Sequence, residues 1–250
     1  MLTWRILEEG IPMTLLTAPT NERAVVIPAE GANLPGVLAW PAHPSGIVLF
    51  AHECGSRCGC PRNRHVVTEL RAAGLATVEC DLLTETEESD LSNRFDVESL
   101  ARRLIAGIHW VGAQPEVADL PIGLFGEGLG AAAVLIAAAM VPQSVAAVVS
   151  RGGCPDLAAN DLPRIEAPTL LLAGSLDSWG VALHSQALAR LTCEKQLVVI
   201  PGMNRAKPEA PETAAGWAAQ WFAYHLGMQP SWRRSHFTLR QSHRLQLAMH

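Results

Sequence analysis

Residues 122–133 read IGLFGEGLGAAA, and this stretch decides the fold. An apolar run ending at Phe125 is followed by glycines at three alternate positions, Gly126, Gly128 and Gly130. An alanine-rich stretch begins directly afterwards. A short apolar run, a cluster of glycines and an alanine-rich segment indicate a buried strand, a sharp turn and a helix. We therefore expect a strand–turn–helix unit of an α/β protein here.

The composition is that of a globular protein with one large domain. The chain has 250 residues, of which 49% are hydrophobic and 17% charged, and its net charge is −5. This length permits a sizeable core, and the negative charge argues against nucleic acid as the main partner. We expect no membrane span, and the acidic start, MLTWRILEEGIP, is unlike a secretory signal. We therefore predict a cytoplasmic protein whose six cysteines are thiols or ligands rather than disulfides.

Short apolar runs alternate with helical stretches along the chain. Strands are expected at residues 24–27, 36–40, 46–52, 76–83, 122–125, 146–150, 169–174 and 196–200. Helices are expected at residues 62–73, 96–111, 129–141, 181–191 and 210–226, and the polar stretch 84–94 is expected to form a loop. Such alternation predicts a mostly parallel sheet covered by helices on both faces. Functional residues in such sheets follow the carboxyl ends of the strands.

The ends of the chain differ from its middle. We divide the sequence into an N-terminal extension, 1–22, an α/β domain, 23–226, and a basic C-terminal tail, 227–250. The tail holds four arginines and no acidic residue, together with Trp232 and Phe237. Such a segment is suited to an acidic partner or an anionic surface, or it is a solvated end. Its role is left open.

Several segments occur in a characteristic order. They are GIVLFAHECGSRCGCPRNR, GLATVECDLLTETEE, IGLFGEGLGAAAVLIAAA, VVSRGGCPDLA, APTLLLAGSLD and VVIPGMNR. Together with flanking stretches they extend from about Ala24 to Leu226, and in this order they resemble the dienelactone-hydrolase-like family of α/β-hydrolases. The resemblance implies an α/β-hydrolase fold, with a mostly parallel central sheet and helices on both faces. It also implies an ancestry of ester, lactone or thioester hydrolysis, and we expect no cofactor and no metal.

The chain departs from this family at the positions that carry the chemistry. The family has Ser or Cys at the centre of a G-x-S-x-G turn, and here that position is Gly128. The position of the triad acid is Asp177, and the position of the triad histidine is Arg205. After the strand that ends in His52, the family usually continues with glycine and forms part of the oxyanion hole, whereas here Glu53 follows.

These departures remove what acyl transfer requires. The reaction needs a nucleophile, a base and hydrogen-bond donors for the oxyanion. Gly128 offers no nucleophile, and Arg205 stays protonated and is no base. Carboxylates of Glu53 and Glu127 would oppose the negative charge of the transition state. The oxyanion-loop positions are His52, Glu53, Cys54 and Leu129, and the pocket positions are Asp81, Glu127 and Arg151.

The most direct interpretation is a protein that has lost hydrolysis and binds a small molecule or a partner at the old active-site mouth. The central residue of such a turn has a positive φ, which glycine adopts at little cost. Gly128 should therefore stabilise the turn. Arg205 and Asp177 are expected to form an ion pair, with Glu127 or Glu53 close by. Whether the protein forms homo-oligomers is left open.

Two alternatives remain. The first is a working hydrolase with an unusual nucleophile such as Cys54, which would need a base, while His184 and His225 are expected at the surface. The second is a nucleotide- or metal-binding protein. The frame Gly126-x-Gly128-x-x-Ala131 fits a dinucleotide fingerprint. His52, Cys54, Cys58 and Cys60 are soft ligands, although their spacing matches no common structural zinc site.

Overall fold

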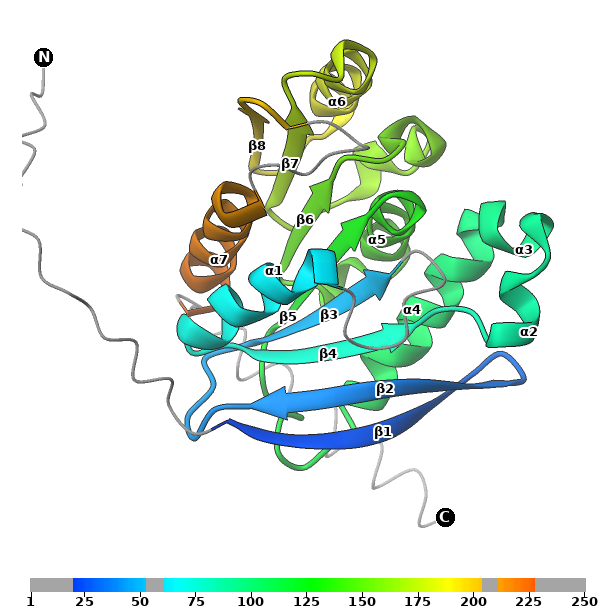
Figure 1. Cartoon of the computed structure of the whole chain (residues 1–250), viewed down its shortest axis with the longest axis vertical. Coiled ribbons are helices and arrows are strands. Elements are labelled where there is room, and N and C mark those ends of the chain that lie inside the picture. The colour runs from blue at the N-terminus through cyan, green and yellow to red at the C-terminus, as the bar shows by residue number, and fades with distance from the viewer. Residues whose placement is uncertain (1–19, 53–60, 204–210, 228–250) are drawn as a thin grey trace, which may run out of the picture.

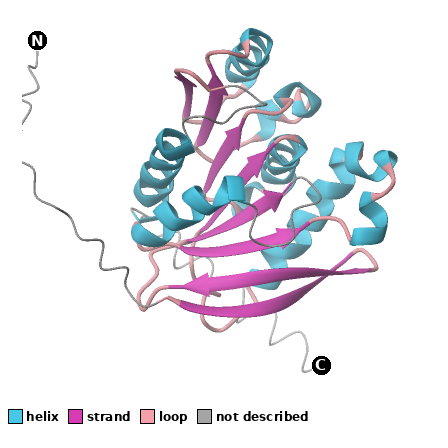
Figure 2. Cartoon of the chain, viewed as in Figure 1, coloured by secondary structure: helices cyan, strands magenta, loops and turns pink. Residues whose placement is uncertain are grey.

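The protein is an eight-stranded sheet with helices on both faces (Figures 1 and 2). The computed structural model describes residues 20–52, 61–203 and 211–227. The strands are β1 (Asn21–Ala29), β2 (Ala32–Trp40), β3 (Ile47–His52), β4 (Ala76–Asp81), β5 (Ile122–Glu127), β6 (Ala147–Arg151), β7 (Thr169–Gly174) and β8 (Lys195–Ile200). The α-helices are α1 (Pro61–Ala72), α2 (Glu85–Glu88), α3 (Leu91–Phe95), α4 (Val97–Val111), α5 (Leu129–Met140), α6 (Ser178–Arg190) and α7 (Pro211–Gly227). Short 3-10 helices are η1 (Pro142–Ser144), η2 (Pro155–Ala158) and η3 (Leu162–Arg164).

The strand order across the sheet is β1-β2-β4-β3-β5-β6-β7-β8. Strands β1 and β2 form an antiparallel hairpin, and β2 lies antiparallel to β4. The six remaining strands are mutually parallel, so their carboxyl ends share one edge of the sheet. This arrangement confirms the α/β-hydrolase fold expected from the sequence.

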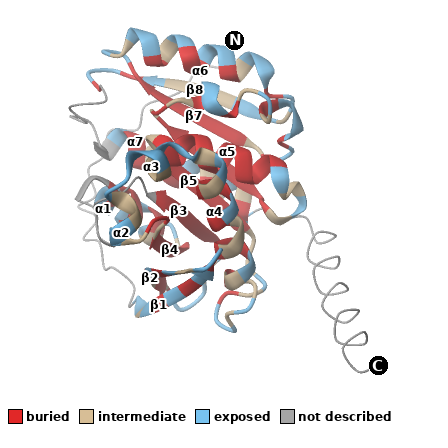
Figure 3. Cartoon of the chain, turned by 90° about the vertical axis from the view of Figure 1, so that its right-hand side faces the viewer, coloured by how far each residue is buried: buried red, intermediate tan, exposed pale blue. Residues whose placement is uncertain are grey.

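Side chains of the central strands alternate between two cores, as the strand pleat requires. In β3, Leu49 belongs to the core that includes residues of α4, α5 and α6, whereas Val48 and Phe50 belong to the core that includes residues of α1 and α7. Figure 3 shows buried residues concentrated in the strands and on the inner sides of the helices. Within the part of the chain that the structure describes, no helix combines the length and the apolar character that crossing a membrane requires.

The turn between β5 and α5, centred on Gly128 and called the elbow below, is closed by glycines. A Cβ atom at Gly126 would overlap the carbonyl oxygen of Gly130, and one at Gly130 would overlap that of Ala51 in β3. Gly128, between them, has φ 63° and ψ −125°, a conformation that side-chain-bearing residues rarely adopt. The positive φ expected at Gly128 is therefore confirmed.

Helix α5 is buried on nearly every side. Eleven of its twelve residues are buried, because it lies between the sheet, α4 and the η2–η3 segment. Its alanines allow these neighbours to approach closely and fill the space without voids. The packing of α5 therefore holds the β5–α5 turn in place.

The expectation of a loop at residues 84–94 was wrong, because this segment contains α2 and α3. Thr84 and Glu87 form a capping box at the start of α2, and Asp90 caps α3. The buried Arg103 of α4 donates to Glu87 Oε2 at 2.7 Å and Oε1 at 2.5 Å, and to the Leu82 carbonyl at 2.8 Å. Short capped helices of this kind lack the apolar periodicity on which the prediction depended.

We predict that Gly128→Ala destabilises the fold by about 1–2 kcal/mol, because alanine at this φ is strained. Gly216→Ala is the matched control, since Gly216 lies within α7 and a Cβ there meets nothing within 4 Å. The control should stabilise the protein by about 0.5–1 kcal/mol. Urea unfolding of both variants measures the difference. A neutral or stabilising result at Gly128 would contradict the strained turn.

A second prediction concerns acid stability. The hydrogen bond from Arg103 is the largest of the effects that lower the pKa of Glu87 from 4.5 to about 2. A carboxyl whose pKa is lowered by folding stabilises the protein above its unfolded pKa, and this contribution is lost as the pH falls through the folded pKa. Wild type should therefore lose stability between about pH 4.5 and about 2 more steeply than Glu87→Gln. Urea midpoints across this window, with Glu69→Gln as the surface control, measure the slope, and equal slopes for all three proteins would refute the assignment.

Candidate functional site

The parallel strands bring the predicted site residues to one edge of the sheet. Within the strand register, His52 of β3 is paired with Asp81 of β4, and Glu127 of β5 is paired with Arg151 of β6. Asp81 lies two strands away from Glu127, because β3 separates β4 from β5. The structure therefore brings Glu127 and Arg151 together directly, whereas Asp81 belongs to another part of the same edge.

Arg151 is the centre of a buried polar cluster. Its side chain is 4% exposed, and its Nη2 donates to Glu127 Oε2 at 2.5 Å and to Asn63 Oδ1 at 2.9 Å. The guanidinium carbon lies 5.4 Å from the centre of the Phe125 ring, a cation–π contact. Glu127 is more accessible, with 27% of its side chain exposed. Within this cluster, Arg151 neutralises the negative charge of Glu127, which directly precedes Gly128 at the elbow.

Asn63 was not among the residues predicted from the sequence. It is 3% exposed and comes from α1, 88 residues before Arg151. The β-strand pleat places Glu127 and Arg151 on the face of the sheet that α1 and α7 cover, because Phe125 and Val149 lie two residues earlier and pack there. No local pattern in the sequence signals this contact, which depends on how α1 crosses the sheet.

The loop after β6 packs against the elbow. A Cβ at Gly153 would overlap the carbonyl oxygen of Gly128, and the amide of Gly152 donates to the carbonyl of Leu172 at 2.7 Å. Cys154 follows immediately, and its side chain is half-buried. This loop therefore places a thiol-bearing residue next in sequence to the glycine that contacts the elbow.

Asp177 follows β7 and caps α6. Its Oδ1 accepts a hydrogen bond from the amide of Gly180 at 2.8 Å, and the side chain is half-buried. Arg205, the expected partner of Asp177, lies outside the described residues, and so do Glu53 and Cys54 of the oxyanion loop. The Arg205–Asp177 ion pair therefore stays a prediction. Leu129, the remaining oxyanion-loop position, is buried at the first residue of α5.

The two histidines do not lie where the sequence analysis placed them. His184 is 1% exposed, and its Nδ1 lies 2.7 Å from the Gly180 carbonyl, so the expectation of a surface position was wrong. It lies on the buried face of α6, together with Gly180, Leu183 and Ala187. The side chain of His225 is 8% exposed and lies beside Glu194, with 3.7 Å between Nε2 and Oε1, and burial lowers its pKa. Cys58 and Cys60, the remaining cysteines of the metal alternative, lie outside the described residues.

We predict that Glu127→Gln destabilises the protein by about 3–5 kcal/mol, because it leaves the buried Arg151 cation without its counter-ion. Arg151→Met should cost less, because the remaining carboxylate reaches solvent. The double variant should be less destabilised than the sum of the two, which a double-mutant cycle by urea unfolding measures. Arg102→Met, which removes the exposed ion pair with Glu30, is the control and should cost less than about 1 kcal/mol. Additive effects at Glu127 and Arg151 would contradict the coupled pair.

Comparison with known proteins places this geometry in a family. No protein-family model matches the chain. The crystal structure of a dienelactone hydrolase from Anabaena variabilis superposes with a TM-score of 0.78 and 43% sequence identity, and the match covers 82% of this chain and 98% of that chain. The esterase domain of a Rhodothermus marinus protein superposes with a TM-score of 0.66 at 18% identity, over 83% of this chain and 100% of that chain, and this second likeness shows the fold alone.

Curated relatives are longer. A putative phosphoribosyl transferase from Mycobacterium tuberculosis is 44% identical over 216 residues, which make up 85% of this chain and 49% of the relative. The chain thus spans about half the length of the curated relatives it matches, and their name describes proteins about twice as long. The 43% sequence identity to the dienelactone hydrolase, over 98% of that chain, shows that this chain has the α/β-hydrolase fold and belongs to the dienelactone hydrolase family.

Proposed function

We propose that this chain is a catalytically degenerate member of the dienelactone hydrolase family that binds a small molecule or a partner at the old active-site mouth. The observation that carries the proposal is Gly128. It occupies the centre of a strained strand-to-helix turn, with φ 63°, and has no side chain to act as a nucleophile. An acyl-enzyme cannot form on a residue without a nucleophilic side chain.

The substituted histidine position supports the same conclusion. Arg205 stands where the family has its base, and a guanidinium keeps its proton at any working pH. Asp177 retains a position suited to orienting a ring, but here its carboxylate caps α6. Loss of both nucleophile and base removes the proton transfer that acyl transfer requires.

On this proposal, the charge that opposes an oxyanion is that of Glu53 rather than that of Glu127. The carboxylate of Glu127 is bound to Arg151, so its negative charge is locally neutralised. Its repulsion of a developing oxyanion is correspondingly reduced. Glu53, next to His52 in the sequence, keeps the role that the sequence analysis gave it.

Exposed apolar side chains at the carboxyl ends of β6 and β7 support a binding role. Leu157 lies in η2, after β6, and Leu176 and Trp179 flank Asp177 after β7. All three are exposed, Trp179 by 70%. Large exposed apolar side chains at one edge of a sheet are typical of surfaces that bind ligands or partners where they form one patch. We therefore expect the bound group to present apolar surface at this rim.

A working hydrolase with another nucleophile is the second candidate, and the position of Cys154 favours it. The thiol is half-buried and belongs to the loop that contacts the elbow. Cys54, predicted for the same role, lies outside the described residues. Either cysteine would require a base to form the thiolate. The cytoplasmic location, the three-part division of the chain and a homo-oligomer also stay predictions.

We predict that the purified chain hydrolyses activated esters no faster than a heat-denatured control. Gly128→Ser alone should change little, because no base is present, whereas Gly128→Ser with Arg205→His should restore activity. Gly128→Ser with Arg205→Gln is the matched control, since glutamine is not a base. Adding Glu53→Gly to the active pair should raise the rate further by removing charge from the oxyanion position.

Two outcomes would contradict this proposal. Saturable, heat-labile hydrolysis by wild type that disappears in Cys154→Ala or Cys54→Ala would establish the second candidate. A folded Gly128→Ser/Arg205→His variant that stays at background on several esters would show that residues 128 and 205 do not share a site. Progress curves on acetyl and butyryl esters, with thermal melts to confirm folding, measure both.

A further inference from the structure

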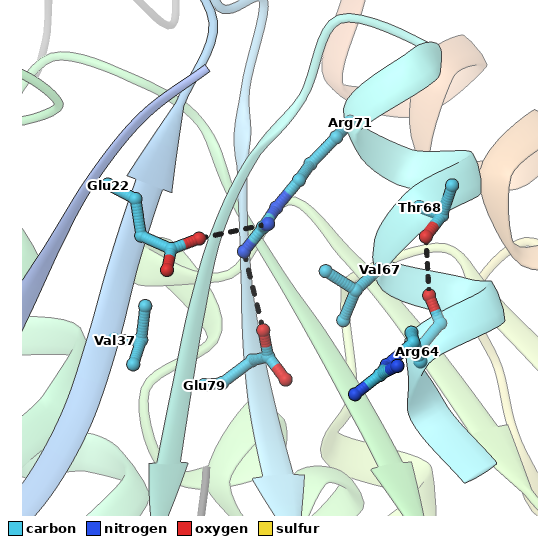
Figure 4. Close-up of a pocket in the computed structure, with 7 residues that line it drawn as sticks. All are labelled: Glu22, Val37, Arg64, Val67, Thr68, Arg71 and Glu79. Atoms are coloured by element: carbon cyan, nitrogen blue, oxygen red, sulfur yellow. Dashed lines mark hydrogen bonds and ion pairs between the residues drawn. The ribbon is translucent and has the colours of Figure 1, made fainter. Parts of the chain in front are cut away.

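A pocket of about 190 Å³ lies between α1 and the outer strands of the sheet (Figure 4). One side of the pocket is a single face of α1, and the other side comes from β1, β2 and β4. The residues that line it are Glu22, Val37, Arg64, Val67, Thr68, Arg71 and Glu79. The α1 residues recur at three- and four-residue intervals, so the helix presents all of them to the pocket. This pocket is formed entirely by described residues and contains none of the predicted site residues.

Arg71 is fully engaged by the protein. Its Nη1 lies 3.3 Å from Glu22 Oε2, its Nη2 lies 3.4 Å from Glu79 Oε1, and its Nε donates to Thr77 Oγ1 at 3.1 Å. Both ion-pair distances exceed the roughly 2.7–2.9 Å of well-formed charge-assisted hydrogen bonds. One guanidinium therefore serves two carboxylates without a close bond to either.

Glu79 is a buried acid at the floor of the pocket. It is 7% exposed, and burial raises its pKa above the usual value despite the opposing effect of Arg71. A carboxylate in this environment is stabilised by further positive charge or by hydrogen-bond donors. A cationic group entering the pocket would supply both.

Arg64 provides the opposite charge. Its side chain reaches toward Glu79 in Figure 4, and its charge opposes the rise in the pKa of Glu79. Among the described residues, no carboxylate lies within ion-pair distance of it. The lining thus contains two carboxylates and two guanidiniums, with no net charge, and the second guanidinium is left for an anion. A ligand that is neutral overall and carries both charges can contact groups of either sign and leave the balance unchanged.

The size of the pocket limits the ligand further. Its volume corresponds to about six water molecules, at roughly 30 Å³ each, and is smaller than the roughly 300–1,000 Å³ of sites for drug-sized molecules. A whole nucleotide does not fit within this volume. Val37 and Val67 add an apolar wall to the charged groups, which suits a short aliphatic chain.

We propose that this pocket binds a small aliphatic α-amino acid in its zwitterionic form. The ammonium group is held by Glu79 and Glu22, and the carboxylate by Arg64. The aliphatic side chain lies against Val37 and Val67. This binding site is separate from the old active-site mouth and does not depend on the function proposed there.

The test is calorimetric titration of the full chain with L-valine. We expect saturable binding to wild type, and a dissociation constant about tenfold or more higher in Arg64→Gln and in Glu79→Gln. Arg64 is exposed, so its variant should fold normally, and thermal melts check this. Arg190→Gln, which alters an exposed arginine at the end of α6, is the matched control and should bind as wild type does.

N-acetyl-L-valine and L-valine methyl ester separate the two charged contacts, because each lacks one charge of the zwitterion. Both should bind at least about tenfold more weakly than L-valine. Equal binding of the acetylated compound would identify an anion site and overturn the proposal. The absence of saturation at about 10 mM L-valine, or unchanged affinity in both pocket variants, would also overturn it.

Discussion

Close backbone approach at the β5–α5 turn is the constraint on which the rest of the structure depends. Gly126 and Gly130 leave no room for side chains, because the carbonyl oxygens of Gly130 and Ala51 occupy that space. With α5 buried almost all round, the helix cannot move outward to relieve a clash. The ends of β5 and β6 are consequently held in register, which sets Glu127 opposite Arg151.

The geometry of this turn and its chemistry have separate physical origins. Packing of small residues maintains the strand, the turn and the helix, and the superposition on a dienelactone hydrolase extends over 98% of that chain. Chemistry depends instead on a few side chains that project from this frame. On our proposal those side chains have been replaced by glycine and arginine, while the frame still presents a mouth with an apolar rim. A scaffold of this kind retains binding after proton transfer has gone.

Local patterns in the sequence predicted most of the fold. Alternating apolar runs and helical periods identified the eight strands and the five long helices, and the glycine frame at residues 126–130 identified the sharp turn. The helices at residues 85–95 were missed, because capping by Thr84 and pairing with Arg103 replace apolar periodicity as the stabilising interaction. Similarly, His184 was placed at the surface because of its residue type, whereas it shares the buried face of α6 with Leu183 and Ala187.

The candidate site was predictable only where sequence neighbours determine it. Gly128 and its positive φ follow from the local motif. Glu127 and Arg151 were placed at strand ends, but their pairing was not predicted, because it depends on β5 and β6 being neighbours in the sheet. The contact of Arg151 with Asn63 joins elements that are remote in sequence, so it required the crossing of α1 over the sheet to be known. The same holds for the pocket under α1, whose residues come from three strands and one helix.

The tight contacts of the elbow have a consequence for the order of folding. The β1–β2 hairpin joins residues close in sequence and closes only a short loop. The elbow, in contrast, requires Ala51 to approach Gly130 and Gly153 to approach Gly128, although a hundred residues separate Ala51 from Gly153. Parallel strands joined by long crossovers pay this loop-closure entropy before the contacts form. We therefore expect the elbow to form late in folding, after the strands and helices around it have docked.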